Sequence, residues 1–155
     1  MPKANAASKR PEAERAAEWY AIKELECVVT RRALHTKFAK VDFFASDVLA
    51  KRVDGSHVYI QVTAGQASAV TARRRKLEKI PWHESDTVQL LQLVQTEDPA
   101  NSRRKLWFFR IHKYEQERGE WWTEMEAVPV PRHWFKAWKG DETEDPRVPH
   151  PSEGG

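Results

Sequence analysis

The stretch VDFFASDVLAKRVDGSHVYIQVTAG, residues 41–65, decides the fold because it predicts a β-hairpin. Two half-apolar segments, 48–53 and 57–63, have the composition of strands. Between them lies Asp54-Gly55, a dipeptide that favours tight hairpin turns. The hairpin places Asp47 at the start of its first strand, and the second strand ends with Gln61 and Thr63.

The length of the turn determines whether Asp47 and Gln61 share a face, because paired residues in an antiparallel ladder point the same way. A two-residue turn would set Asp47 opposite Val62 and send Gln61 to the other face. A loop with an odd number of residues pairs position 47 with position 61. We predict an odd loop or a bulge, which brings the two side chains together.

Acidic and amide oxygens beside a block of cations predict a metal-dependent site for a phosphate backbone. Mg²⁺ and Mn²⁺ prefer oxygen ligands, and Asp47 and Gln61 supply two. Asp42 is either a further ligand or the acid that orders the basic loop around it. The next predicted helix carries consecutive cations, some of which we expect to contact phosphates, namely Arg73, Arg74, Arg75 and Lys76.

The remaining pattern predicts alternating helices and strands. A helix is expected from Pro11 to about residue 25, then a strand over 27–34 and a basic loop over 35–41. A helix over 66–79 ends before Pro81. Strands are expected at 88–94 and 106–112, joined by the polar segment TEDPANSRRK, followed by a strand at 121–130 and a short aromatic helix at 132–139.

The length of 155 residues favours one domain, which we place at 11–139 between a flexible N-terminus, 1–10, and a disordered tail, 140–155. The 26 Lys and Arg exceed the 23 Asp and Glu by only three, but basic blocks at 31–40 and 73–79 predict one cationic face. The single cysteine and the absence of a long apolar run predict an intracellular, cytoplasmic protein with no membrane partner.

The order α-β-β-β-α-β resembles that of the PD-(D/E)XK nucleases, and within them the archaeal-type Holliday junction resolvases and their phage relatives. The likeness covers about residues 11–112 and rests on an acid in the first helix, an aspartate opening the second strand and a site triplet on the third. The matching pieces are Glu14-Arg15, VVTRR ending at Arg31-Arg32, VDFFASDVLA and VYIQVTAG.

This resemblance implies an α/β fold with a PD-(D/E)XK-type core, a central mixed sheet flanked by helices. It implies a Mg²⁺- or Mn²⁺-dependent endonuclease that resolves four-way DNA junctions as a homodimer, in the host cytoplasm if a phage encodes it. A metal-activated water would attack the phosphate in line and the 3′ oxygen would leave. Glu14, Asp47 and Gln61 would bind metal, with Thr63 as the further catalytic position. The residues expected to touch DNA are Arg15, Arg31, Arg32, Lys37, Lys40, Arg73, Arg74 and Arg75.

Two positions depart from the family pattern. Gln61 stands where an acid is usual and brings no negative charge, so metal affinity should be lower. Thr63 stands where lysine is usual, so either Lys51 substitutes or the mechanism depends on metal alone. The choice of Glu14 competes with the neighbouring acids Glu12, Glu18, Glu24 and Glu26.

Other functions remain open from the sequence. The chain could be another PD-(D/E)XK enzyme that processes DNA, a DNA-binding module without catalysis, or a single-strand or RNA-binding protein that uses its seven tryptophans. We favour core and dimer-interface packing for the tryptophans, with segment 88–94 and the C-terminal third as the dimer interface. His35 is a candidate phosphate contact, and we give the histidines no catalytic role.

Overall fold

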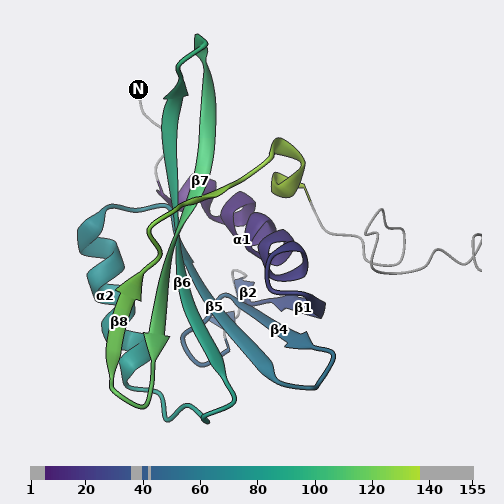
Figure 1. Cartoon of the computed structure of the whole chain (residues 1–155), viewed down its shortest axis with the longest axis vertical. Coiled ribbons are helices and arrows are strands. Elements are labelled where there is room, and N and C mark those ends of the chain that lie inside the picture. The colour runs from purple at the N-terminus through teal and green to yellow at the C-terminus, as the bar shows by residue number, and fades with distance from the viewer. Residues whose placement is uncertain (1–5, 36–39, 42, 137–155) are drawn as a thin grey trace, which may run out of the picture.

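The computed structural model describes residues 6–35, 40–41 and 43–136, with the backbone alone at 6–10, 34–35 and 40–41. The chain is an α/β protein built on a mixed sheet. Within the described residues this sheet has seven strands in the order β1-β4-β5-β6-β7-β8, with β9 attached to β7. The helices α1 and α2 lie on opposite sides of it (Figure 1).

Helix α1 spans Ala6–Lys23 and contains Pro11. The prediction that Pro11 begins this helix is wrong, because the alanine-rich residues before it continue the helix towards the N-terminus. The buried side chains Ala13, Ala16, Ala17 and Tyr20 pack α1 against the sheet. Three of them are alanines, so the helix backbone lies close to the strands.

The first part of the sheet follows the predicted order α-β-β-β-α-β. Strands β1 (Cys27–Arg32), β4 (Val48–Arg52) and β5 (His57–Thr63) are antiparallel neighbours. Helix α2 (Ala67–Glu78) then carries the chain to β6 (Thr87–Asp98), which runs parallel to β5. Where a basic loop was predicted, the chain forms a small two-stranded ladder of β2 (Leu34–His35) and β3 (Lys40–Val41).

Strands β6 and β7 (Asn101–Glu115) form a long hairpin whose tip extends beyond the rest of the sheet (Figure 1). The prediction that TEDPANSRRK joins two shorter strands is wrong, since most of it is paired and only the tip at Pro99 and Ala100 lies outside both strands. Ion pairs link Lys105 to Glu97 at 3.8 Å and Arg104 to Asp98 at 4.0 Å. Cross-strand partners therefore support the polar half of the ribbon.

The C-terminal part crosses the sheet and returns to α1. Strand β8 (Glu120–Thr123) pairs with one end of β7, and β9 (Val128–Pro129) pairs near its middle. One strand over 121–130 was predicted, which is wrong because residues 124–127 are unpaired. The predicted helix at 132–139 is a single 3₁₀ turn, η1 (Arg132–Phe135), while 137–139 and the predicted tail lie outside the described residues.

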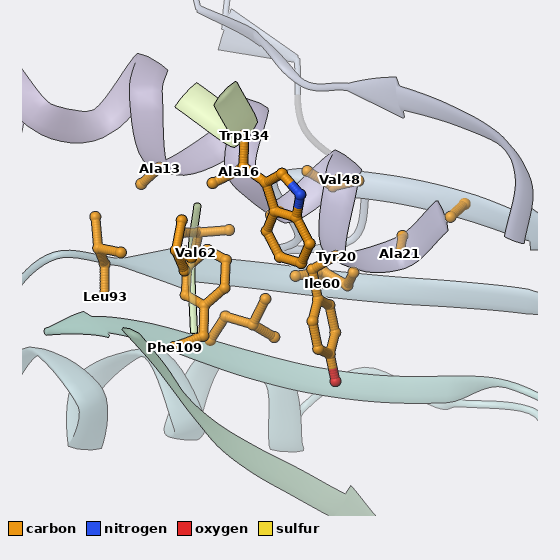
Figure 2. Packing of buried hydrophobic residues seen from close by; sticks show 14 of the residues in the cluster. Ala13, Ala16, Tyr20, Ala21, Val48, Ile60, Val62, Leu93, Phe109 and Trp134 are labelled. Atoms are coloured by element: carbon orange, nitrogen blue, oxygen red, sulfur yellow. The ribbon is translucent and has the colours of Figure 1, made fainter. Parts of the chain in front are cut away.

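Both faces of β5 are covered, so residues 58–63 are all buried. Val58, Ile60 and Val62 pack with α1 (Figure 2), so the residues that alternate with them, Tyr59, Gln61 and Thr63, face the α2 side. Ala13, near the start of α1, lies close to Val62 and Leu93, so this half of the helix covers the carboxyl end of β5 (Figure 2). The hairpin thus directs its polar residues to one face.

Strand β6 lies between β5 and β7 in the interior of the sheet. Its apolar side chains Val88, Leu90, Leu91 and Leu93 are at most 3 % exposed. The prediction that segment 88–94 supplies a dimer interface is therefore wrong, because the core of the chain already uses it. Of the C-terminal tryptophans, Trp134 is buried against α1 and Trp122 is half exposed, while Trp138 lies outside the described residues.

No helix in the described part of the chain is long and apolar enough to cross a membrane.

Candidate functional site

The β4–β5 hairpin brings Asp47 beside the segment of β5 that contains Gln61. The ladder pairs Val48 with Ile60 and continues to Lys51 with His57. The backbone N–H of Arg52 also donates to Ser56, which leaves the three-residue loop 53–55 with Gly55 at φ 89°. The predicted odd loop is confirmed. The ladder ends at Val48 with Ile60, and Asp47, just before β4, donates its backbone N–H to the same Ile60. The side-chain oxygens of Asp47 and Gln61 both lie within hydrogen-bond distance of the Val62 N–H, so the two side chains are neighbours at this end of β5.

Asp47 is almost completely buried, at 2 % exposure. Its side-chain oxygen Oδ2 accepts a hydrogen bond from the backbone N–H of Val62 at 3.0 Å. Its own backbone N–H donates to Ile60 at 2.8 Å, and its carbonyl accepts from Ala33 at 2.7 Å. Asp47 is therefore held between the end of β1 and the edge of β5, and its carboxylate continues the ladder beyond β4.

Gln61 is 5 % exposed and has a fixed orientation. Its side-chain Nε2 donates to the carbonyl oxygen of Ala45, so the amide oxygen Oε1 points the other way. That oxygen lies 3.2 Å from the backbone nitrogen of Val62 and 3.4 Å from Nη1 of Arg73. Phe44 and Ala45 have positive φ angles of 53° and 63°, so Gln61 holds a loop in a conformation that non-glycine residues rarely adopt.

Thr63 has a local structural partner. Its hydroxyl oxygen accepts a hydrogen bond from the backbone N–H of Gly65 at 2.9 Å and forms part of the turn into α2. A Cβ at Gly65 would lie 2.8 Å from the Cβ of Ala69, so the turn requires glycine. Lys51, the predicted substitute cation, is exposed and lies four residues along β4 from Asp47, about 13 Å at the rise of a strand. It is not beside Gln61.

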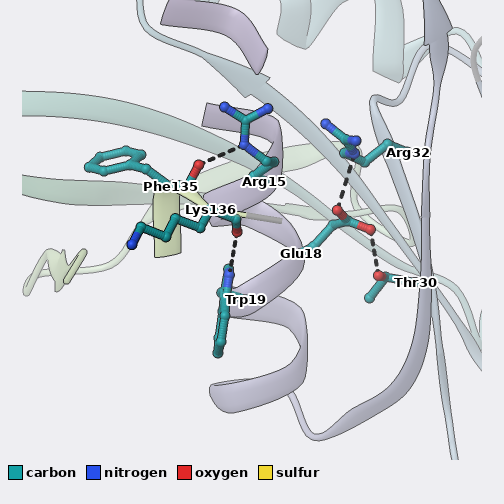
Figure 3. Close-up of polar contacts among 7 residues, drawn as sticks. All are labelled: Arg15, Glu18, Trp19, Thr30, Arg32, Phe135 and Lys136. Carbon is teal, nitrogen blue, oxygen red and sulfur yellow. Dashed lines mark hydrogen bonds and ion pairs between the residues drawn. The ribbon is translucent and has the colours of Figure 1, made fainter. Parts of the chain in front are cut away.

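Of the acids on α1, Glu18 forms part of a packed polar cluster (Figure 3). It accepts a hydrogen bond from Thr30 at 2.6 Å and pairs with Arg32 at 3.2 Å. Burial raises the pKa of Glu18, although Thr30 and the Arg32 charge act in the opposite direction. Glu14 is 5 % exposed and lies four residues before Glu18 on α1, about one helical turn away. Its role as a metal ligand stays a prediction.

The predicted DNA-contacting arginines near α1 differ in their surroundings. Arg15 donates from Nε to the carbonyl oxygen of Phe135 at 2.6 Å, and Arg32 pairs with Glu18 (Figure 3). Arg31 lies next to Arg32 on the edge strand β1 and is exposed. Lys37 lies outside the described residues, as does the side chain of Lys40.

The arginines of α2 divide into two groups. Arg75 and Lys76 are exposed, whereas Arg73 and Arg74 are partly buried and directed to the sheet. The Nε atoms of Arg73 and Arg74 are both buried and have no hydrogen-bond partner among the described residues. Helix α2 thus carries two exposed cations, while Arg73 and Arg74 contact the polar face of the sheet.

A polar chain beside Arg74 was not expected from the sequence. Arg74 donates from Nη2 to Nδ1 of His112 at 2.7 Å, so the histidine proton is on Nε2 and points to Gln92 at 3.2 Å. Gln92 in turn donates to the carbonyl oxygen of Gly65 at 3.3 Å. Burial, with the charges of Arg74 and Arg110, lowers the pKa of His112 to about 4. These hydrogen bonds link α2 to β7, β6 and the turn that follows Thr63.

The oxygens at positions 47 and 61 fit a hard divalent cation in ligand type. Asp47 brings one negative charge and Gln61 a neutral carbonyl, and Mg²⁺ in proteins often keeps several water ligands. Within the described residues, no group of three or more His, Cys, Asp or Glu is arranged to hold a metal ion. A metal here would therefore rely on the Gln61 oxygen and on water, and binding should be weak without substrate phosphate.

A cavity in the described part of the chain lies elsewhere. It has a volume of about 790 Å³ and is formed between the end of α1, strand β7 and segment 124–131. Its polar groups include Glu24 and the ion pair of Lys113 with Glu124, at 2.8 Å. None of the predicted site residues lines it.

Comparison with known proteins gives no match: no family model, curated protein or solved structure is similar to this chain.

Proposed function

We propose that this chain is a metal-dependent, structure-selective DNA endonuclease that resolves four-way junctions by phosphodiester hydrolysis. The observation that carries the proposal is that side-chain oxygens of Asp47 and Gln61 both lie beside the backbone N–H of Val62, at 3.0 and 3.2 Å. Arg73 of α2 contacts the same glutamine. Two oxygen ligands and a cation therefore meet at one end of a buried strand, which is the combination that cleavage of a phosphodiester requires.

We also propose that the fold has a PD-(D/E)XK-type core. The support is the order α1-β1-β4-β5-α2-β6, with three antiparallel strands followed by a helix and a parallel strand. Asp47 comes directly before the second of these strands, and Gln61 and Thr63 end the third. The ladder of β2 and β3 is an insertion before Asp47 in this scheme.

The proposed roles follow from the contacts. Asp47 and Gln61 would hold Mg²⁺ or Mn²⁺, with Glu14 as the candidate third ligand. When bound, the metal supplies a water of lowered pKa and positive charge at the phosphate. The Val62 N–H fixes the Asp47 carboxylate and also lies beside the Gln61 amide oxygen. Thr63 shapes the turn into α2 through its bond to Gly65.

Branched DNA is the proposed substrate, and the support is the distribution of cations around this end of the sheet. Exposed Arg31 lies on the edge strand, and exposed Arg75 and Lys76 lie on α2. A homodimer is proposed because junction resolution requires two symmetric cuts. Among the described residues, the large exposed apolar side chains at one end of the sheet, Trp122 and Met125, are the candidates for its interface.

The test is cleavage of a synthetic four-way junction with Mg²⁺ or Mn²⁺, beside a linear duplex of the same sequence and a chelator control. The proposal expects metal-dependent cuts in two opposite strands of the junction and none in the duplex. Equal cutting of the duplex would contradict junction selectivity. Binding of the junction without cutting under either metal would contradict the enzyme.

A second candidate, a DNA-binding module without catalysis, is favoured by one observation. Asp47, Gln61 and Thr63 are at most 5 % exposed, and each has a hydrogen-bond partner within the fold. On this account the same residues only hold the loop, the hairpin and α2 together. Such a module would bind the junction with the same affinity whether or not a divalent metal is present.

A further inference from the structure

We propose that Arg73 binds the scissile phosphate and supplies the positive charge that neither Thr63 nor Lys51 provides. This inference rests on the proposed function and names one of its catalytic residues. Arg73 lies on α2, and its Nη1 approaches the Gln61 amide oxygen at 3.4 Å. Among the described residues, it is the cation that contacts the Gln61 side chain.

The guanidinium of the partly buried Arg73 has few partners within the described residues. Its Nε atom is inaccessible and has no acceptor, and no carboxylate of the described residues forms an ion pair with it. The contact with Gln61 is long and the acceptor is neutral. Buried cations are normally paired, and a buried donor without an acceptor is unfavourable. Arg73 is therefore arranged for an anion that comes from outside the chain.

A phosphodiester matches this requirement. The guanidinium presents a planar set of donors that binds two phosphate oxygens at once. The ligand would approach through the Nη groups, and a small change of side-chain rotamer would bring Nε into contact. Because Gln61 is already beside Arg73, the bound phosphate would lie next to the oxygens proposed to hold the metal.

The neighbouring cations are less suited to this role. Arg74 is held by His112, by Thr123 at 3.4 Å and by the ring of Trp121, whose centroid is 5.2 Å away. Arg75 is exposed on another side of the helix and can reach only flanking phosphates. Arg74 would therefore position α2, while Arg73 contacts the reacting group.

The chemical step is ordinary hydrolysis. Water forms the new bond to phosphorus, the bond from phosphorus to the 3′ oxygen breaks, and the proton lost by water is balanced by one gained by the leaving oxygen. Arginine stays protonated at neutral pH, so Arg73 would stabilise the charge on the non-bridging oxygens and would not act as a base.

The experiment measures single-turnover cleavage at saturating protein, and separately the Kd, for a fluorescent four-way junction. The variants are Arg73→Gln, Arg73→Lys and the matched control Arg118→Gln in the exposed turn after β7. Arg73→Gln should lower the cleavage rate by about 10²- to 10³-fold, as loss of one transition-state donor does. Its Kd should change by less than about threefold, since one phosphate contact among many is lost. Arg118→Gln should leave both the cleavage rate and the Kd unchanged.

Arg73→Lys keeps the charge and should recover at least about tenfold of the rate lost in Arg73→Gln. A merely structural role would instead show as a lower melting temperature with an unchanged rate at saturation. If Arg73→Gln does not fold, Arg73→Lys decides: lysine keeps the charge but loses the two-point contact, so it should cleave about tenfold more slowly than the wild type, and a rate equal to that of the wild type would overturn the proposal. If the wild type cleaves the junction and Arg73→Gln is equally active, only this inference is overturned. If the wild type never cleaves, the proposed function is overturned as well.

Discussion

The backbone N–H of Val62 donates a hydrogen bond to the carboxylate of Asp47 at 3.0 Å, so the proposed metal ligand also extends the β4–β5 ladder. This double role determines how variants of Asp47 should be interpreted. A substitution that removes both the charge and the acceptor changes the site and the fold together. A substitution that keeps an acceptor separates the two.

Asp47→Asn should abolish junction cleavage while leaving the protein folded. Asparagine keeps an oxygen that can accept from Val62 but removes the negative charge that a divalent cation needs. Asp47→Ala should be less stable than Asp47→Asn by about 1 kcal/mol, because the Val62 N–H then keeps only the longer contact with the Gln61 amide oxygen. Urea unfolding and cleavage assays on both variants test this. Cleavage by Asp47→Asn at the wild-type rate would rule out Asp47 as a ligand.

Gln61→Glu should strengthen metal binding and weaken the loop at once. The added charge should lower the Kd for Mn²⁺ by about tenfold, which corresponds to about 1.4 kcal/mol. The carboxylate can no longer donate to Ala45, so segment 43–46 should become more sensitive to protease. Gln92→Glu is the matched control, because Gln92 lies on the same face and contacts Gly65. Calorimetric titration that finds equal Mn²⁺ affinity in folded Gln61→Glu would count against the site.

The hairpin register could be predicted from the sequence because it depends on local chemistry, the turn at Asp54-Gly55 and the alternation of the strands. The orientation of Gln61 could not, since it depends on Ala45 in a loop with two left-handed residues and on how α2 lies across β5. The long β6–β7 ribbon was missed for a similar reason. Its polar pairs, such as Lys105 with Glu97, contribute only once the strands are adjacent.

Arg31 and Arg32 are adjacent in the sequence but should respond differently to substitution. Arg31→Gln removes an exposed cation, so junction affinity should fall, and the slope of log K against log salt should decrease by about 1. Arg32→Gln breaks the pair with Glu18 (Figure 3) and should lower stability. A fluorescence-anisotropy salt titration and a melting curve on each variant measure the two effects. The idea fails if Arg31→Gln binds as tightly as the wild type at every salt concentration.

His112 should make the fold less stable as the pH falls from about 6.5 to about 4. Burial and the charges of Arg74 and Arg110 lower the pKa of His112 to about 4, whereas the unfolded chain has an ordinary histidine near 6.5. Between these values the unfolded state binds more protons, so the free energy of unfolding rises with pH. Between pH 6.5 and pH 4, His112 changes the free energy of unfolding by at most about 3 kcal/mol.

His112→Gln should flatten that part of the pH profile. Glu18 has the opposite effect, because its raised pKa favours the folded state as the pH falls. Both proteins contain Glu18, so the difference between the wild type and the variant isolates His112. Urea unfolding at pH 7 and pH 5 provides the measurement. Parallel profiles for the two proteins would show that His112 is protonated equally in both states.

The most direct test of the central claim is a crystal structure with Mn²⁺ and a junction DNA, in which anomalous scattering locates the metal. The proposed function predicts one Mn²⁺ with an oxygen of Asp47 and the Gln61 amide oxygen as ligands, both within about 2.0–2.6 Å. It also predicts a DNA phosphate between the metal and Arg73. A structure with DNA bound, Gln61 still turned away from any metal, and no anomalous peak near Asp47 would contradict it.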